Sequence, residues 1–186
     1  MKISAAYIKA ISLFAADKND ARTFIHSVAI NQGHIVATNG HVLGAIEIDS
    51  EFDVCIPFDA VSVLLKTLSE KDIREGVLIE VTENALAYKN VTVSFEPIKK
   101  FPLQWVDFIT KHTEAIAHPY FDWKNIELFN KAAKILTNQK YLSTGFFTNG
   151  PDAARFEISL MPEFKGVIMP MHHDERQQKK QTKTAA

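Results

Sequence analysis

The sequence predicts an α+β fold built from three units, each a helix followed by antiparallel strands. Amphipathic segments occur at three places, and short runs of alternating apolar and polar residues follow each of them, joined by turn residues. The units span roughly residues 1–50, 51–100 and 118–171. The segments "PFDAVSVLLKTL" and "YFDWKNIELFNKAAKIL" share Phe-Asp followed by an apolar stripe, which supports an internal repeat.

Three segments carry apolar side chains at spacings of three and four and are therefore expected to be helical. They lie at about Ser4–Asp17, Phe58–Ser69 and Trp123–Leu136. Pro57 stands just before the second segment, where a helix can begin. Asp122 stands just before the third and is a candidate N-cap.

The strands are predicted from alternation and from turn residues. "VTVSFEP" and "ARFEISL" alternate, and "VLIEVTENALAYK" contains two strands joined by a turn at Glu83-Asn84. "SVAINQGHIVATNGHVLGAIEI" contains three strands, with turns at Asn31-Gln32-Gly33 and Thr38-Asn39-Gly40. Residues 101–119 contain two prolines and little periodicity, so we expect an irregular connector there.

Composition narrows the functional class. The chain has 186 residues and is 46% hydrophobic, which is enough for a sizeable core, and its formal charge of −1 argues against binding polyanions by bulk charge. One cysteine, Cys55, excludes a disulfide framework within the chain and suits a reducing cytoplasm. No apolar stretch approaches the eighteen residues of a membrane span, and we interpret the N-terminal segment as an amphipathic helix. We therefore expect a cytoplasmic protein.

The residues favour no catalytic site. The sequence has no Ser-His-Asp pattern, no Gly-rich phosphate loop and no paired acids in a cleft-like setting. Cys55 stands in the apolar strand "FDVCIPF", where a thiol is usually inert packing. The histidines have no cysteine or carboxylate beside them at a metal-ligand spacing. We expect no enzyme activity, no metal and no cofactor.

Four stretches resemble one protein family. "ATNGHVLGAIEI", "IPFDAVSVLLKTL" and "VSFEPIKKFPLQW" are similar to the middle domain of the bacterial DNA polymerase III β sliding clamp, where the first stretch contains Ala-Thr-Asp-Gly-His-Arg-Leu. The last part, ending "GVIMPM", is similar to the second half of the clamp's final domain, which ends in Met-Pro-Met. The resemblance implies a DNA-clamp fold, with a clamp-like domain at 1–110 and half a domain at 111–171. Residues 172–186 contain no apolar anchor and are expected to form a flexible tail. The clamp's first domain and half of its last are missing, so simple dimerisation would not rebuild its ring of six domains.

The resemblance also implies a peptide-binding pocket where the hairpin corner and the Met-Pro-Met meet. Such a pocket would receive Gln, Leu and Phe anchors of motifs in DNA polymerases, clamp loaders and repair proteins. Val42 replaces the family's Arg, and His172-His173 replace its final Arg-Leu, so the preferred peptide could differ. Taken by themselves, the corner could be an ordinary hairpin and the methionines core filling. The expected pocket residues are Ile25, Thr38, Gly40, His41, Val42, Leu43, Pro102, Val106, Met169, Pro170 and Met171.

Lysines on the expected helices have two interpretations. They can form an ordinary solvated face, or, as the resemblance implies, they can contact the phosphates of double-stranded DNA without sequence preference. The leading hypothesis is a clamp-like replication accessory protein that binds partner peptides and holds DNA as a homo-oligomer joined through sheet edges. The alternative is a clamp-fold interaction module, an adaptor or competitor, that never encircles DNA. The lysines concerned are Lys9, Lys66, Lys71, Lys131 and Lys134.

Overall fold

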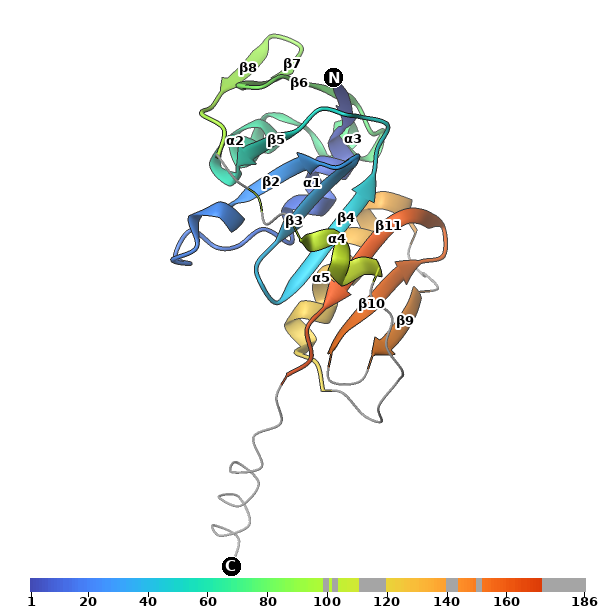
Figure 1. Ribbon diagram of the computed structural model, residues 1–186. Coiled ribbons are helices and arrows are strands. Elements are labelled where there is room, and N and C mark those ends of the chain that lie inside the picture. The colour runs from blue at the N-terminus through green and yellow to red at the C-terminus, as the bar shows by residue number, and fades with distance from the viewer. Residues whose placement is uncertain (99–100, 102–103, 111–119, 140–143, 150–151, 172–186) are drawn as a thin grey trace, which may run out of the picture.

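The computed structural model describes residues 1–98, 101, 104–110, 120–139, 144–149 and 152–171. It contains two sheets, and all of their strand pairs are antiparallel (Figure 1). The larger has the order β5-β2-β3-β4-β11-β10-β9 and the smaller the order β1-β6-β7-β8. The predicted α+β class is therefore confirmed.

The strands predicted from alternation and turn residues are present, whereas β1 and β9 lie outside the strand segments predicted from the sequence. β2, β3 and β4 are joined at the two expected turns, and β6 and β7 at the turn containing Glu83 and Asn84. Gly33 and Gly40 have φ angles of 71° and 85°, a conformation that glycine adopts without strain. The strands are β1 (Lys2–Ser4), β2 (Ser27–Asn31), β3 (His34–Thr38), β4 (Val42–Glu47), β5 (Val54–Pro57), β6 (Leu78–Val81), β7 (Ala85–Tyr88), β8 (Val91–Ser94), β9 (Thr144–Asn149), β10 (Asp152–Ile158) and β11 (Met161–Ile168).

The three predicted helices are present. They are α1 (Ala5–Ser12), α2 (Phe58–Thr67) and α5 (Trp123–Thr137). The Asp122 side chain accepts a hydrogen bond from the backbone N–H of Lys124 at 2.9 Å, which confirms the predicted N-cap.

Two further helices and a 3₁₀ turn were not predicted. They are α3 (Glu70–Arg74), α4 (Trp105–Thr110) and η1 (Thr23–Ile25). The expectation of an irregular connector at 101–119 was wrong where α4 forms. That helix has six residues, too few to show a period of 3.6 in the sequence.

The helices lie on two faces of the larger sheet. Val28, Ile30 and Ile35 point to the face covered by α1, α2 and α5 and join the main core. Ala29 and Val36 alternate to the opposite face, where Trp105 of α4 packs. Figure 1 shows α4 in front of the sheet and α5 behind it. The smaller sheet packs against α2 through β7 and β8.

The first and third units share one core where β4 pairs with β11. Gly44 stands opposite Gly166 in that pair, and the missing side chains make room for the rings of Phe14 and Phe129. These two rings lie with their centroids 5.1 Å apart, and Phe129 stacks on Phe156 at 4.4 Å. The larger sheet is therefore continuous from the first unit into the third.

A polar network holds α3 against the smaller sheet. Ser69 and Asp72 form a reciprocal capping box at the start of α3. The Tyr88 hydroxyl of β7 donates to the same Asp72 carboxylate at 2.8 Å. Hydrogen bonds from Ser69 and then Tyr88 hold the pKa of Asp72 well below its usual value.

Candidate functional site

The corner between β3 and β4 is held by its own polar side chains. The Thr38 hydroxyl donates to the carbonyl of Val42 at 2.7 Å and accepts from the N–H of Gly40 at 3.0 Å. The Asn39 side chain accepts from the N–H groups of His41 and Val42 at 2.9 and 3.0 Å. The polar groups of the turn are thus hydrogen-bonded to one another. The side chains around the turn can therefore present an apolar surface.

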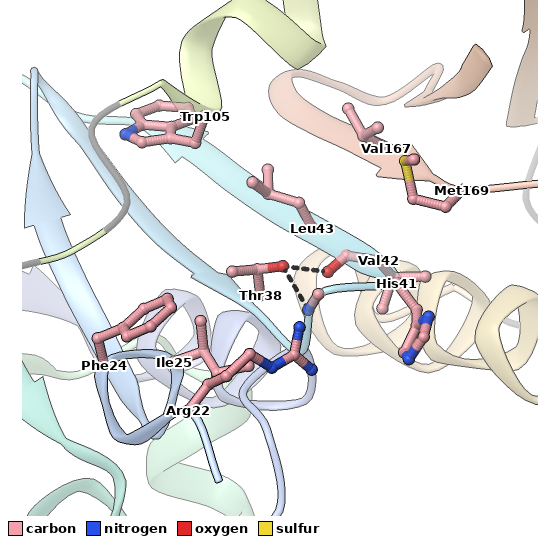
Figure 2. Close-up of a pocket in the computed structure, with 11 residues that line it drawn as sticks. Arg22, Phe24, Ile25, Thr38, His41, Val42, Leu43, Trp105, Val167 and Met169 are labelled. Atoms are coloured by element: carbon pink, nitrogen blue, oxygen red, sulfur yellow. Dashed lines mark hydrogen bonds between the residues drawn. The ribbon is translucent and has the colours of Figure 1, made fainter. Parts of the chain in front are cut away.

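A cavity of about 240 Å³ lies beside this corner. Its walls come from the β3–β4 corner, η1, the first residue of α4 and the end of β11 (Figure 2). Segments from the beginning, middle and end of the sequence thus meet at one place. Seven of the expected pocket residues line the cavity: Ile25, Thr38, Gly40, His41, Val42, Leu43 and Met169.

Of the other four expected residues, the three that the structure describes do not line the cavity. Pro170 is half-buried and Met171 is 55% exposed, and neither lines the cavity. The N–H of Met171 donates to the carbonyl of Tyr120 at 2.7 Å, and Tyr120 does not line the cavity either. Val106 packs against the apolar cluster that contains Leu43, Trp105 and Val167, and Pro102 lies outside the described residues.

Four lining residues were not predicted: Arg22, Phe24, Trp105 and Val167. Val167 had a usable signal, because strand alternation puts it on the same face as Met169. Trp105 was assigned to a connector without structure, and the segment that contains Arg22 and Phe24 has no apolar period. Nothing local in the sequence indicated that these three side chains meet the β3–β4 corner.

Among the described residues that line the cavity, only Arg22 carries a permanent charge. Its guanidinium donates to both carboxylate oxygens of Asp20, at 2.9 and 2.7 Å, and to the Asn39 carbonyl at 3.1 Å. The hydrogen bonds from Arg22 hold the pKa of Asp20 well below its usual value. The φ of 85° at Gly40 makes any side chain there strained, and an added Cβ would also displace the Arg22 guanidinium. Arg22 therefore links the loop before η1 to the corner.

The lining suits binding and not proton transfer. Most of the walls are aliphatic or aromatic carbon, and the polar atoms of Thr38 are already used within the turn. His41 is exposed at the rim. The volume is below the roughly 300–1,000 Å³ of sites for whole small molecules. A space of this size can hold one or two apolar side chains.

The five lysines proposed to face DNA are distributed over four helices. Lys71 forms an ion pair with Glu75, the residue just after α3, at 3.8 Å, and Lys131 forms one with Glu127 of α5 at 3.2 Å. Such exposed pairs are weak and leave the lysine available to another anion. All five except the half-buried Lys9 are exposed: Lys9 in α1, Lys66 in α2, Lys71 in α3, and Lys131 and Lys134 in α5.

Other kinds of site find little support among the described residues. No three histidine, cysteine, aspartate or glutamate side chains in them are grouped so as to hold a metal ion. Burial, and then the charge of Asp53, raises the pKa of the Cys55 thiol to about 11, so this thiol is a poor nucleophile at neutral pH. Of the helices described, none has the length and apolar character needed to cross a membrane.

Comparisons with known proteins identify the fold. No family model matches the sequence, and no curated protein matches it. Solved structures similar to this chain include the DNA polymerase III β subunit of Borrelia burgdorferi (12% identity, TM-score 0.66) and the sliding clamps of Pseudomonas aeruginosa (16%, 0.61) and Bartonella birtlesii (16%, 0.60). The alignments cover 94%, 93% and 92% of this chain but only 64%, 66% and 66% of those clamps, so the chain spans slightly less than two thirds of their length. The Borrelia protein was solved with a natural product and the Bartonella clamp with griselimycin. The chain has the fold of the bacterial DNA polymerase III β sliding clamp.

Proposed function

We propose that this protein is a sliding-clamp-like accessory factor of DNA replication whose cavity binds short clamp-binding motifs of partner proteins. The observation that carries the proposal is the meeting of Leu43, from the hairpin motif, and Met169, from the C-terminal motif, in the wall of one apolar cavity. The partners would be DNA polymerases, clamp loaders or repair proteins. The protein would act without catalysis.

The cavity has the properties expected of a peptide-anchor site. Buried apolar anchors usually carry most of the energy of such an interface. Phe24 and Met169 are 40% and 41% exposed, so they stand at the mouth where an incoming side chain would cover them. A methionine side chain is flexible and polarisable and adapts to different anchors. The backbone of Met169 is fixed by a hydrogen bond from its N–H to the His41 carbonyl at 2.8 Å.

Peptide titration calorimetry tests the proposal with two neighbouring methionines. Met169→Ala should weaken a Gln-Leu-x-Leu-Phe type peptide by on the order of 1–2 kcal/mol, roughly five- to thirtyfold. Met171→Ala is the matched control, because Met171 is also exposed but does not line the cavity. We expect its affinity to stay within about twofold of wild type.

Circular dichroism should show both variants folded, since both side chains are partly exposed. Wild-type protein that shows no binding at millimolar peptide would contradict the proposed function. Equal losses in Met169→Ala and Met171→Ala would mean that the peptide extends over both residues, as the sequence resemblance implied.

We further propose that copies of the chain associate through sheet edges and hold DNA as an oligomer. β5 and β9 are the two edges of the larger sheet, and β9 exposes Phe146 and Phe147 by 39% and 46%. Exposed edge strands with large apolar side chains favour pairing with another chain. Light scattering at high protein concentration should give a mass above that of a monomer. A strictly monomeric protein that still binds peptide would favour the adaptor or competitor role.

A further inference from the structure

The side chain of Trp105, which forms one wall of the cavity, is hydrogen-bonded to a residue that does not line it. The indole N–H of Trp105 donates to the side-chain oxygen of Asn31 at 2.9 Å, across 74 positions of sequence. Both residues are buried, with exposures of 2% and 8%. The His34 ring meets the indole edge-on, with centroids 5.1 Å apart. Neither Asn31 nor His34 lines the cavity.

The indole itself does line the cavity. Trp105 packs with Leu43 and Val167 in the apolar cluster on this face of the sheet. Figure 2 shows its nitrogen turned away from Leu43, so the carbon part of the ring lies towards the cavity. The bond to Asn31 therefore satisfies the polar end of the side chain at a distance from the site where an apolar anchor would sit.

The sheet, and not α4, determines where this ring stands. α4 has six residues, and a helix this short is not stable without tertiary contacts. Asn31 is the last residue of β2 and lies in register with His34, the first residue of β3. Without Asn31 the indole N–H would be buried with no acceptor, which is costly, so the ring would turn or the helix would shift.

We propose that Asn31 is a positioning residue for the peptide cavity: it fixes the Trp105 indole as the inner wall and thereby sets the affinity for a peptide's leucine or phenylalanine anchor. This inference rests on the proposed function of the cavity. According to this inference, Asn31 affects the peptide affinity although the peptide would not contact it.

The test uses a parent protein in which Trp123→Phe leaves Trp105 as the only tryptophan. The chain has two tryptophans, and Trp123 is 79% exposed, so this change should be harmless. Asn31→Leu, Trp105→Phe and the double variant are then titrated with the same Gln-Leu-x-Leu-Phe type peptide. Asn31→Leu removes the acceptor, and Trp105→Phe removes the donor but keeps an aromatic ring. Leu160→Ala, an exposed apolar side chain that does not line the cavity, is the surface control.

Each of the two variants should lose affinity by about three- to tenfold, since each breaks the same hydrogen bond. The double variant should lose no more than the weaker-binding single variant, because the two residues act through one contact. In Asn31→Leu the Trp105 emission should shift to longer wavelength, and Leu160→Ala should bind like the parent.

Three results would overturn the inference. One is parental affinity in a folded Asn31→Leu, and another is losses that add in the double variant. If Asn31→Leu does not fold, parental affinity in Trp105→Phe would overturn the inference instead. A parent that binds no peptide contradicts the proposed function and the inference together, whereas a binding parent with unaffected variants contradicts the inference alone.

Discussion

Gly44→Ala tests the joint between the first and third units. Gly44 lies in β4 opposite Gly166 of β11, and the ring of Phe14 lies over it. A Cβ added at Gly44 would stand 2.6 Å from the nearest ring atom. Carbon atoms in contact prefer separations of about 3.5–4.0 Å, so the ring would have to retreat by about 1 Å.

The ring has little room to retreat. Phe14 is fully buried, and the rings of Phe129 and Phe164 flank it with centroids 5.1 and 6.1 Å away. Overpacking of a core in this way costs about 1–3 kcal/mol of the free energy of unfolding. For a chain of this size, each kcal/mol lowers Tm by about 2–4 °C, so we expect Gly44→Ala to lower Tm by about 2–12 °C.

Urea denaturation and calorimetry would measure the loss, and Phe14→Leu supplies the control. Phe14→Leu alone should destabilise the protein by leaving a void. In the Gly44→Ala background the smaller side chain should relieve the clash, so the double variant should be more stable than the sum of the two changes predicts. Full stability of Gly44→Ala, or strict additivity of the two changes, would refute the account of a close-packed glycine joint.

Two further predictions concern charge. Hydrogen bonds from Ser69 and Tyr88 lower the pKa of Asp72, so their stabilisation is complete above the usual carboxyl pKa and is lost as pH falls below about 4 towards the lowered value. In Asp72→Asn, the free energy of unfolding should therefore decrease less between about pH 5 and pH 3 than in the wild type. The same pH dependence in both proteins would contradict this role of Asp72. Reversal of both Lys66 and Lys131 to Glu should weaken association with double-stranded DNA in protein lacking residues 172–186, and wild-type binding should fall steeply with salt. If the variant with both lysines changed to Glu binds DNA as well as the wild type does, α2 and α5 do not contact DNA through these lysines.

Local pattern was enough to predict most elements. Alternation and the two glycine turns predicted β2, β3 and β4, because a strand's period and a turn with positive φ are properties of adjacent residues. The period of 3.6 likewise predicted α1, α2 and α5. It could not predict α3 or α4, since a helix of one or two turns contains too few residues to display a period.

The sequence by itself determined the classes of structure and, through two separated motifs, most of one wall of the cavity. Only the tertiary structure decided that β4 pairs with β11, which brings Leu43 near Met169. It also decided that Met171 bonds to Tyr120 and does not line the cavity, and that the Trp105 indole bonds to Asn31. The physical reason is that periodicity reports contacts between near neighbours. The register of paired strands and the packing of side chains from distant segments depend on the whole core. The side chains that form each cavity wall are positioned by residues far away in the sequence.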